Sequence, residues 1–243
     1  MARDWKTEYE KRVDFLKNAL QTTGAKGFVF GNSGGKDSAL VGILCHAACE
    51  NTLGVVMPCS SSRNYGEDRD DGLALAKQFD ISCVQVDLTP AKEALVQAIT
   101  PAQAITDAAA SNIAPRLRMT TLYAIAQSRG CLVAGTGNRS ERFVGYYTKW
   151  GDGAFDINPI ADLTATEIFD FLRYLQAPAH IVEKAPSAGL FEGQTDEGEM
   201  GFTYAALDRY ILTGEGDPAD VEKIESMHRR SAHKRVPPLT YGE

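Results

Sequence analysis

Residues 31–38 read Gly31-Asn32-Ser33-Gly34-Gly35-Lys36-Asp37-Ser38, and the rest of the chain is organised around them. A short apolar run precedes this stretch, and apolar residues at helical spacing follow it over residues 39–48. This order predicts a strand, a glycine turn and the first turn of a helix. Glycines let the backbone approach a ligand closely, and a helix N-terminus offers unpaired N–H groups to an anion. The stretch therefore predicts a phosphate or pyrophosphate site.

Asp37 changes what this site is expected to bind. A carboxylate repels phosphate unless a cation lies between them, so Asp37 is predicted to be a Mg²⁺ ligand, while Ser33 and Ser38 add hydroxyl groups. The spacing differs from that of the Walker loop and from the dinucleotide-binding G-x-G-x-x-G. The alternative is an ordinary strand-to-helix turn that holds glycine and serine by chance.

The composition predicts one α/β domain that spans residues 1–243. The chain is 44% hydrophobic and 23% charged, which is ordinary for a globular protein. No apolar run approaches the roughly 18 residues of a membrane span, and the polar N-terminus lacks the core of a signal peptide. We therefore expect a cytoplasmic protein that does not contact a membrane.

The net charge of −7 argues against nucleic acid as a partner. The five cysteines are scattered and form no Cys-x-x-Cys pair, which argues against structural zinc or disulfides.

Strand and helix patterns alternate along the chain, which predicts a doubly wound, mostly parallel sheet with helices on both faces, a Rossmann-like fold. Pro115 interrupts one helical stretch, so either a kink or a new helix is expected there. The predicted strands are residues 28–30, 53–57, 81–86 and 131–134, and the predicted helices are residues 3–22, 37–51, 67–79, 90–106, 107–129, 164–175, 203–212 and 218–230.

Further ligand-binding residues are expected at the carboxyl ends of the strands, where doubly wound sheets bind their ligands. Residues 135–141 form a second glycine turn there, and Glu141 is either a second Mg²⁺ ligand or a surface glutamate. Residues 59–66 are either a plain surface loop or a border of an adenine pocket. Arg116 and Arg118 follow the break at Pro115. Either one of them binds an anionic ligand, or both belong to a solvated basic face.

Two long segments fit neither helix nor strand periodicity, namely residues 143–160 and 185–201. Long irregular segments in a compact domain are usually functional. The basic residues at 227–235 stand out in an acidic chain. They form a solvated tail, a partner for the acidic loops, or a site that captures phosphate.

Taken together, these segments resemble the ammonia-dependent NAD synthetases of the N-type ATP pyrophosphatase (PP-loop) superfamily, over nearly the whole chain. The first motif is shared across the superfamily, whereas those at 147–160 and 185–197 are much more specific. The motifs are Ser-Gly-Gly-Lys-Asp-Ser at 33–38, Gly-Thr-Gly-Asn-Arg-Ser-Glu at 135–141, Tyr-Thr-Lys-Trp-Gly-Asp-Gly with Asp-Ile-Asn-Pro-Ile at 147–160, Ala-Pro-Ser-Ala-Gly-Leu at 185–190, Gln-Thr-Asp-Glu at 194–197 and His-Lys-Arg at 233–235.

The resemblance implies an adenine nucleotide alpha hydrolase-like fold and assigns residues to each ligand. ATP is expected to contact residues 31–38, Thr136 and Ser187, and Mg²⁺ to be held by Asp37 and Glu141. The expected deamido-NAD ligands are Arg116, Lys149, Asp156, His233 and Lys234, and the expected catalytic residues are Asp37, Lys149 and Asp156. One departure stands out, because many relatives carry a lysine where this chain has Ala165. Lys36 or Lys184 is the candidate to replace that contact with an ATP phosphate.

The implied reaction is ATP-dependent amidation of deamido-NAD to NAD, the last step of NAD biosynthesis, by a ligase that releases AMP and pyrophosphate. Ammonia is the expected nitrogen donor, because no glutamine amidase domain is recognised, and Asp152 or Asp156 is a candidate acceptor of a proton from ammonium. The resemblance also implies a homodimer. Two alternatives remain: a tRNA-modifying PP-loop enzyme, which usually shows a basic surface and reactive or zinc-binding cysteines, and a nucleotide-binding module without catalysis.

Overall fold

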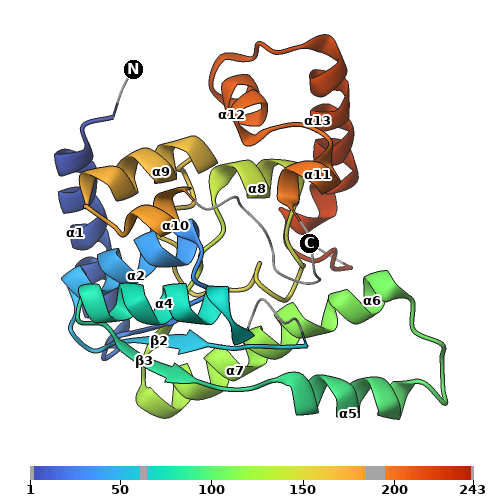
Figure 1. The fold of residues 1–243 in the computed structure, drawn as a ribbon, viewed down its shortest axis with the longest axis horizontal. Helices are drawn as coiled ribbons and strands as arrows, with labels where there is room; N and C mark the ends of the chain where they lie inside the picture. Colours follow the sequence, from blue (N-terminus) through green and yellow to red (C-terminus); the bar gives the residue numbers. More distant parts are fainter. Residues whose placement is uncertain (1–2, 61–64, 184–194, 242–243) are drawn as a thin grey trace.

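A computed structural model describes residues 3–60, 65–183 and 195–241 of the chain (Figure 1). In these residues, none of the helices is both long and apolar enough to cross a lipid bilayer. The strands are β1 (Phe28–Gly31), β2 (Thr52–Val56), β3 (Ser82–Gln85) and β4 (Leu132–Ala134). The helices are α1 (Trp5–Thr23), α2 (Lys36–Ala48), α4 (Glu67–Gln78), α5 (Thr89–Ile99), α6 (Asp107–Ser111), α7 (Ile113–Arg129), α8 (Arg139–Val144), α9 (Ala165–Tyr174), α10 (Ala179–Glu183), α11 (Asp196–Met200), α12 (Tyr204–Thr213) and α13 (Pro218–Arg230), followed by the 3-10 helix η1 (Ala232–Lys234).

The four strands form one parallel sheet in the order β3-β2-β1-β4. The chain first builds outward from β1 to β2 and β3, and then returns to add β4 on the other side of β1. Adjacent parallel strands whose connections leave in opposite directions create a crevice at their carboxyl ends, and that crevice is where ligands bind in such folds. The predicted Rossmann-like α/β class is confirmed, and the crevice lies between β1 and β4.

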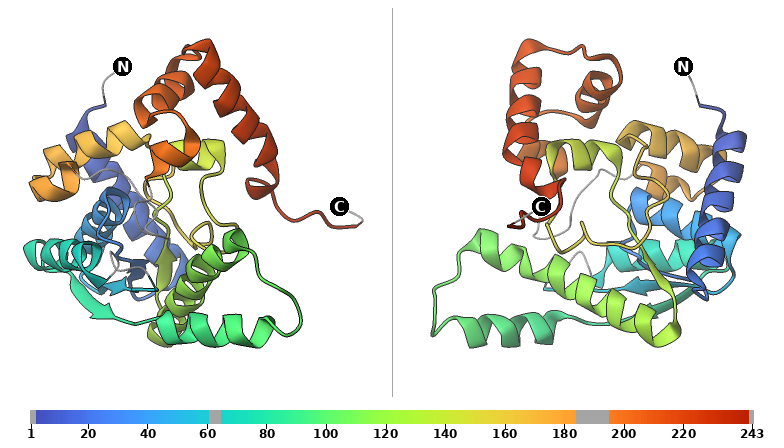
Figure 2. Two further views of the ribbon diagram at one scale, coloured as in Figure 1. Left: turned by 45° about the vertical axis from the view of Figure 1, so that its right-hand side comes forward. Right: turned by 180° about the vertical axis from the view of Figure 1, so that it is seen from behind.

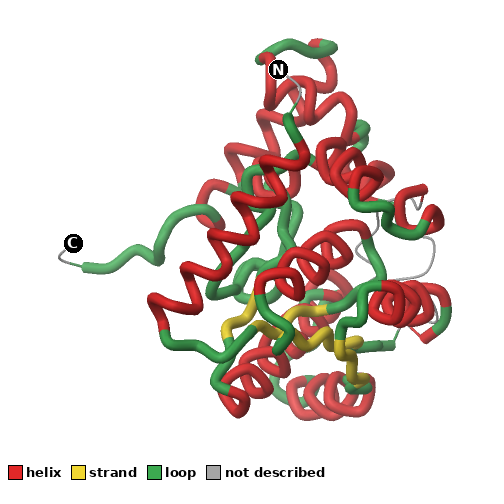
Figure 3. Tube along the Cα trace, turned by 90° about the vertical axis from the view of Figure 1, so that its left-hand side faces the viewer, coloured by secondary structure: helices red, strands yellow, loops and turns green. Residues whose placement is uncertain are grey.

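Both faces of the sheet are covered by helices, which explains why its inner strands read as apolar runs. Side chains alternate between the two faces along a strand. Phe28 and Phe30 pack with the cluster that includes α1, α2 and α9, whereas Val29 packs with Ala126 of α7 and Val133 of β4. Figures 1 and 3 show the strands enclosed between these helical layers. The helix α2 is apolar on most sides because it lies between the sheet, α1 and α9.

The last part of the chain forms a separate cluster beside the carboxyl edge of the sheet. Helices α8, α12 and α13 pack together around Val144, Leu207 and Ile224. Figure 2 shows α13 leading from this cluster towards the C-terminus, and just after it Lys234 of η1 donates to the carbonyl of Gly145 in the loop that follows α8. This arrangement brings the basic C-terminal residues near the crevice.

Two predicted boundaries need correction, and one open alternative, at Pro115, is decided. The helix expected over residues 90–106 ends at Ile99. Thr100 still has helical dihedrals, but Pro101 after it has no backbone N–H with which to continue the helical hydrogen bonds. The break near Pro115 is a new helix, and Pro115 lies in its first turn, where a missing N–H is tolerated. The irregular segment at 185–201 contains the helix α11, whereas residues 61–64 and 184–194 lie outside the described part of the chain.

Candidate active site

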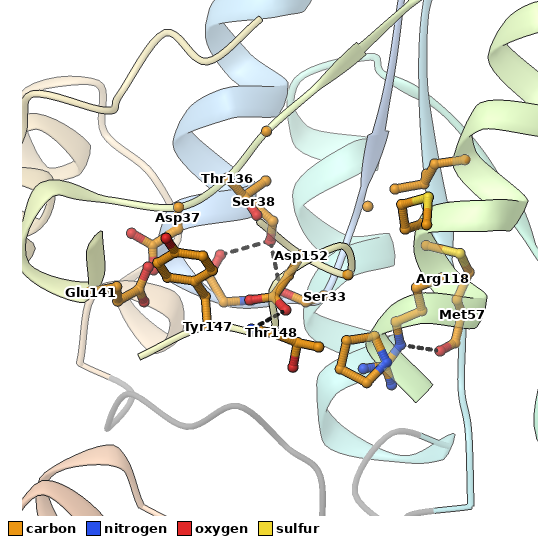
Figure 4. Close-up of a pocket in the computed structure, with 18 of the residues that line it drawn as sticks. Ser33, Asp37, Ser38, Met57, Arg118, Thr136, Glu141, Tyr147, Thr148 and Asp152 are labelled. Atoms are coloured by element: carbon orange, nitrogen blue, oxygen red, sulfur yellow. Dashed lines mark hydrogen bonds between the residues drawn. The ribbon is translucent and has the colours of Figure 1, made fainter. Parts of the chain in front are cut away.

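A cavity of about 500 Å³ opens at the crevice between the carboxyl ends of β1 and β4. The ends of β1, β2 and β4 supply one side of it, and α7 with the loop after α8 supplies the other. Figure 4 shows Asp37 and Glu141 at one end of the cavity, and Arg118 with Met57 at the other. Two predicted ligand loops, which lie a hundred residues apart in sequence, therefore face one space.

The glycine loop has the geometry of an anion site. Every residue of the 31–38 stretch except Gly34 lines the cavity. Gly34 itself has a φ of 75°, and a Cβ atom there would lie 2.1 Å from the carbonyl oxygen of Asp68 in the first turn of α4. Only glycine fits such a close approach at positive φ. Within the described part of the chain no side chain caps the N-terminus of α2, so its first N–H groups are available to an anion.

Asp37 and Glu141 are brought together by Asn138, a fully buried residue that caps the N-terminus of α8. Asn138 Nδ2 donates to Asp37 Oδ1 over 3.0 Å. The same side chain accepts from the Glu141 backbone N–H at 3.0 Å, and Glu141 Oε2 accepts from the Asn138 backbone N–H at 3.1 Å. The asparagine three residues before a glutamate is a capping-box signal in the sequence. The same signal identifies Asn138 as a functional residue, because its cap also places Glu141 beside Asp37.

The charges around Asp37 are unusual for a protein interior. Lys36 is only 5% exposed, and its ammonium lies 2.5 Å from Asp37 Oδ2. Burial raises the pKa of Glu141 well above its ordinary value, the charge of Asp37 adds to this effect, and Lys36 opposes it. Burial by itself lowers the pKa of Lys36, but the attraction of Asp37, Glu141 and Asp196 outweighs it, so that this pKa is raised.

The donor set at this end of the cavity fits a magnesium ion that is shared with a nucleotide. Mg²⁺ in proteins commonly takes one or two carboxylates and completes its shell with water and substrate phosphates. Asp37 and Glu141 supply two carboxylates beside the glycine loop. Across the described residues, no group of three or more His, Cys, Asp or Glu side chains is arranged to hold a metal. The protein therefore offers part of a coordination shell, and phosphate oxygens would supply another part.

Arg118, and not Arg116, is the arginine of α7 that reaches the cavity. Arg118 Nε donates to the carbonyl oxygen of Met57 at 3.1 Å, and burial lowers its pKa. The guanidinium of Arg116 instead donates to the carbonyls of Asn112 and Lys149, over 3.4 and 3.3 Å. Arg118 lies three residues after Pro115 and on the same side of α7, and Pro115 also lines the cavity, but the sequence alone does not show which side of the helix faces it.

The C-terminal segment and the loop after α8 are joined by reciprocal hydrogen bonds at the cavity rim. Lys234 Nζ donates to the carbonyls of Gly145 and Tyr147, over 2.7 and 2.6 Å. In return, the Tyr147 hydroxyl donates to the Lys234 carbonyl at 2.7 Å. Burial lowers the pKa of Lys234. In the same loop, Asp152 lines the cavity, accepts from the Thr148 N–H at 2.9 Å, and has its pKa raised by burial.

The other predicted site residues lie at different distances from this cavity. Thr136 lines it, as do Asp37, Glu141 and Lys234. Lys149, Asp156 and His233 do not line it. Lys149 Nζ donates to the His233 carbonyl at 2.7 Å, and Asp156 Oδ2 accepts from the Val133 N–H at 2.8 Å. Ser187 and Lys184 lie outside the described residues.

Comparison with known proteins gives consistent results. A sequence model of the family described as NAD synthase matches residues 8–238. The NH(3)-dependent NAD(+) synthetase of Carboxydothermus hydrogenoformans is 47% identical, with 98% of each chain covered. Among solved structures, NMN synthetase from Francisella tularensis has a TM-score of 0.95 and 36% identity, with 100% of both chains covered. NH3-dependent NAD synthetase from Campylobacter jejuni, solved with nitrate, has a TM-score of 0.81 and 29% identity over 98% of this chain and 99% of its own.

Proposed function

Because the chain belongs to the NAD synthase family, whose members are ligases that form carbon–nitrogen bonds, we propose that it amidates deamido-NAD to NAD with ammonia and ATP. The observation that supports this proposal best is the shared cavity of the glycine loop and the Asp37–Glu141 pair. Such a cavity suits a triphosphate and a cation. The family match favours this function over the RNA-modifying enzyme and over the module without catalysis.

The reaction begins with activation of the acid, because a carboxylate is a poor electrophile. An oxygen of the nicotinate carboxylate bonds to the α-phosphorus of ATP, and pyrophosphate leaves. Ammonia then attacks the acyl carbon, AMP departs with that oxygen, and the nitrogen gives up a proton. Magnesium, held by Asp37, Glu141 and phosphate oxygens, would supply charge neutralisation for the departing pyrophosphate. The glycine loop and the N–H groups of α2 position and stabilise the phosphates.

For the nitrogen step we assign the proton acceptor to Asp152. This carboxylate lines the cavity, and partial desolvation there raises its pKa, which brings it closer to the range in which a carboxylate accepts a proton. Asp156 is the weaker candidate, because both of its oxygens are already bonded, one to Val133 N–H and the other to the Tyr123 hydroxyl at 3.1 Å.

The second substrate is assigned to the rim of the cavity and the surface beyond it. Lys234 is at the rim, and Arg118 is added here as a cationic group within the cavity. Arg116, Lys149, Asp156 and His233 lie outside the cavity of a single protomer. A dinucleotide is long enough to extend past the cavity, so these residues remain proposed ligands of its distal part.

We further assign the chain to a homodimer, because one side of the molecule exposes apolar groups on its sheet and helices. Val84 of β3 is 42% exposed and Leu95 of α5 is 40% exposed. The helix α5 buries none of its residues within the protomer. Light scattering behind a sizing column checks this, and a monomer at micromolar concentration contradicts it. The expected cytoplasmic location stays a prediction.

A second candidate substrate is nicotinate mononucleotide, the acid that corresponds to NMN. The observation that favours it is the TM-score of 0.95 to the NMN synthetase of F. tularensis, over the full length of both chains. The chemistry at the carboxylate is the same for both acids. The two acids differ in the adenylyl group, which deamido-NAD carries and the mononucleotide lacks, so the question is whether the site also binds that group.

The test is a turnover assay with purified protein, ATP, Mg²⁺ and ammonium, read by mass spectrometry. Parallel reactions contain deamido-NAD or nicotinate mononucleotide, and a third contains glutamine in place of ammonium. NAD with one AMP per turnover supports the main proposal, and a higher kcat/KM for the mononucleotide supports the second candidate. ATP cleavage that requires tRNA supports an RNA-modifying enzyme. Binding of ATP without any turnover supports a nucleotide-binding module.

A further inference from the structure

Lys36 occupies a fixed place inside the acidic end of the cavity. It is the first residue of α2, and its ammonium lies near two aromatic rings. Its Nζ is 5.6 Å from the ring centroid of Phe169 and 5.5 Å from that of Tyr204. At 5% exposure, the side chain is shielded from water. A buried lysine stays protonated only where negative charges compensate its charge, and here Asp37 lies in direct contact with it.

Three carboxylates surround this ammonium. Asp37 accepts its hydrogen bond directly, and Glu141 and Asp196 attract it through space. Both oxygens of Asp37 are engaged, Oδ2 by Lys36 and Oδ1 by Asn138 Nδ2. A cation that approaches Asp37 in the absence of nucleotide therefore meets a carboxylate whose two oxygens are already bonded, and meets a positive charge beside it.

Ala165, an uncharged residue, lies on the same side of this site. It is fully buried in the cluster that contains Tyr204, whose ring faces Lys36. Four residues further along α9, Phe169 provides the second ring. Ala165 thus brings no charge to this side of the site, and the positive charge there comes from Lys36 of α2 instead.

We propose that Lys36 is a resident cation that makes divalent-metal binding depend on bound nucleotide. The proposal deepens the function assigned above, since it concerns the magnesium site of the same reaction. Without nucleotide, Lys36 neutralises Asp37 and repels a second cation. When ATP enters, its phosphates add several negative charges and new oxygen ligands, which restores the attraction for a divalent ion. Metal and nucleotide then bind with positive coupling, which must be reciprocal.

The experiment measures Mn²⁺ binding, by electron paramagnetic resonance of the free ion, and does not require turnover. Wild type, Lys36→Met and Lys36→Arg are titrated without nucleotide. We expect weak binding to wild type and to Lys36→Arg, and binding to Lys36→Met that is tighter by about 10-fold, within the usual range of coupling between sites. Lys77→Met is the matched control, because it removes an exposed lysine of α4, and it is expected to bind as wild type does.

Because the coupling between metal and nucleotide is reciprocal, the effect of the metal on nucleotide affinity provides a second test. The affinity of α,β-methylene-ATP for each protein is measured with and without Mn²⁺. Mn²⁺ is expected to strengthen binding of the analogue to wild type more than to Lys36→Met. The proposal is overturned if wild type binds Mn²⁺ tightly without nucleotide, or if Lys36→Met binds it no better than wild type does.

Thermal unfolding separates this role from a structural one. Lys36→Met leaves three carboxylates without their internal cation, so its Tm is expected to be lower and to rise with Mn²⁺ far more than that of wild type. A lower Tm that Mn²⁺ does not restore indicates packing alone and contradicts the proposal. If Lys36→Met does not fold, Lys36→Gln carries the same comparison. Failure of the amidation assay leaves these binding results unchanged, so the two hypotheses fail separately.

Discussion

Asn138 Nδ2 donates a hydrogen bond to Asp37 Oδ1 over 3.0 Å, although 101 residues separate them in the sequence. The bond joins the N-terminus of α8 to that of α2. Because Asn138 also closes the capping box with Glu141, one buried side chain orients both proposed magnesium ligands. Groups that orient metal ligands usually matter almost as much as the ligands themselves.

Asn138→Ala is expected to weaken metal-dependent turnover by about 10- to 100-fold, the usual effect of losing a residue that orients metal ligands. It also removes an N-cap, which costs about 1 kcal/mol of the free energy of unfolding. Thr164→Ala is the matched control, because Thr164 forms the same kind of capping box on α9 and does not line the cavity. Turnover is measured for both variants as a function of Mg²⁺ concentration, and their free energies of unfolding are measured in urea. Equal losses of turnover in both variants would assign Asn138 a capping role only.

Asp37→Asn is expected to abolish adenylation, with a loss of about 100-fold or more, because an amide is a poor ligand for magnesium and cannot balance its charge. The fold should persist, since asparagine has the same shape. Pyrophosphate release measures the first chemical step, and circular dichroism monitors the fold. Activity close to that of wild type would remove Asp37 from the metal site.

The sheet and its ligand edge could be predicted from the sequence, because their signals are local. The apolar run at residues 28–30, the glycines after it and the acid at position 37 lie within one short stretch. The same holds for the turn at residues 135–141. What brings these turns together is the strand order, and the return of the chain to β4 beside β1 follows from the parallel, doubly wound rule.

Gly34→Ala is expected to destabilise the protein more than Gly24→Ala does. Both glycines have positive φ, 75° and 71°, at which alanine costs about 1–2 kcal/mol. A Cβ atom at Gly24 meets nothing within 4 Å, whereas one at Gly34 meets the Asp68 carbonyl at 2.1 Å. Gly34→Ala should also lower turnover, because it displaces the anion loop from α4. Chemical unfolding measures the difference, and equal costs at both positions would argue against the close contact.

Lys234→Ala is expected to raise KM for deamido-NAD by about 10-fold while changing KM for ATP little, because one charge-assisted contact contributes roughly 1.5–3 kcal/mol. The variant also frees the carbonyls of Gly145 and Tyr147 at the cavity rim. Arg235→Ala is the control, since Arg235 binds the Phe143 and His228 carbonyls and does not line the cavity. An unchanged KM for the dinucleotide in Lys234→Ala would contradict the assignment.

Asp162→Asn is expected to lower stability at neutral pH and to match wild type in acid. Burial alone would raise the pKa of Asp162, but its hydrogen bonds and attraction to Arg12, with that of Arg3, lower it below the ordinary 3.8. A lowered folded-state pKa gives stability that is present above 3.8 and is lost as the pH falls through the folded value. Because Asp162 is partly exposed, the difference is on the order of 1 kcal/mol.

Unfolding of Asp162→Asn and wild type at pH 7 and pH 3 measures this effect. Asp170→Asn, which removes an exposed partner of Arg173 on α9, is expected to change stability little at either pH. A difference between Asp162→Asn and wild type that persists undiminished at pH 3 would show that charge is not its source.

Other parts of the site could not be predicted, because they depend on contacts between distant segments. Which arginine of α7 enters the cavity depends on how that helix rotates against the sheet, and the two candidates are only two residues apart. Lys234 and Tyr147 lie 87 residues apart, and each donates a side-chain hydrogen bond to the backbone carbonyl of the other. Because every residue has a carbonyl, no sequence motif predicts such a contact. The place of Lys36 among three carboxylates likewise depends on how α2, α8 and α11 come together in the fold.

The adenylated intermediate is tested most directly by transfer of an isotope. Deamido-NAD that carries ¹⁸O in both oxygens of its nicotinate carboxylate is incubated with the protein, ATP, Mg²⁺ and ammonium, and the products are weighed by mass spectrometry. Activation at the α-phosphorus predicts one ¹⁸O in NAD and one in AMP for each turnover. NAD formed with unlabelled AMP, or with ADP in place of AMP, would contradict the proposed reaction.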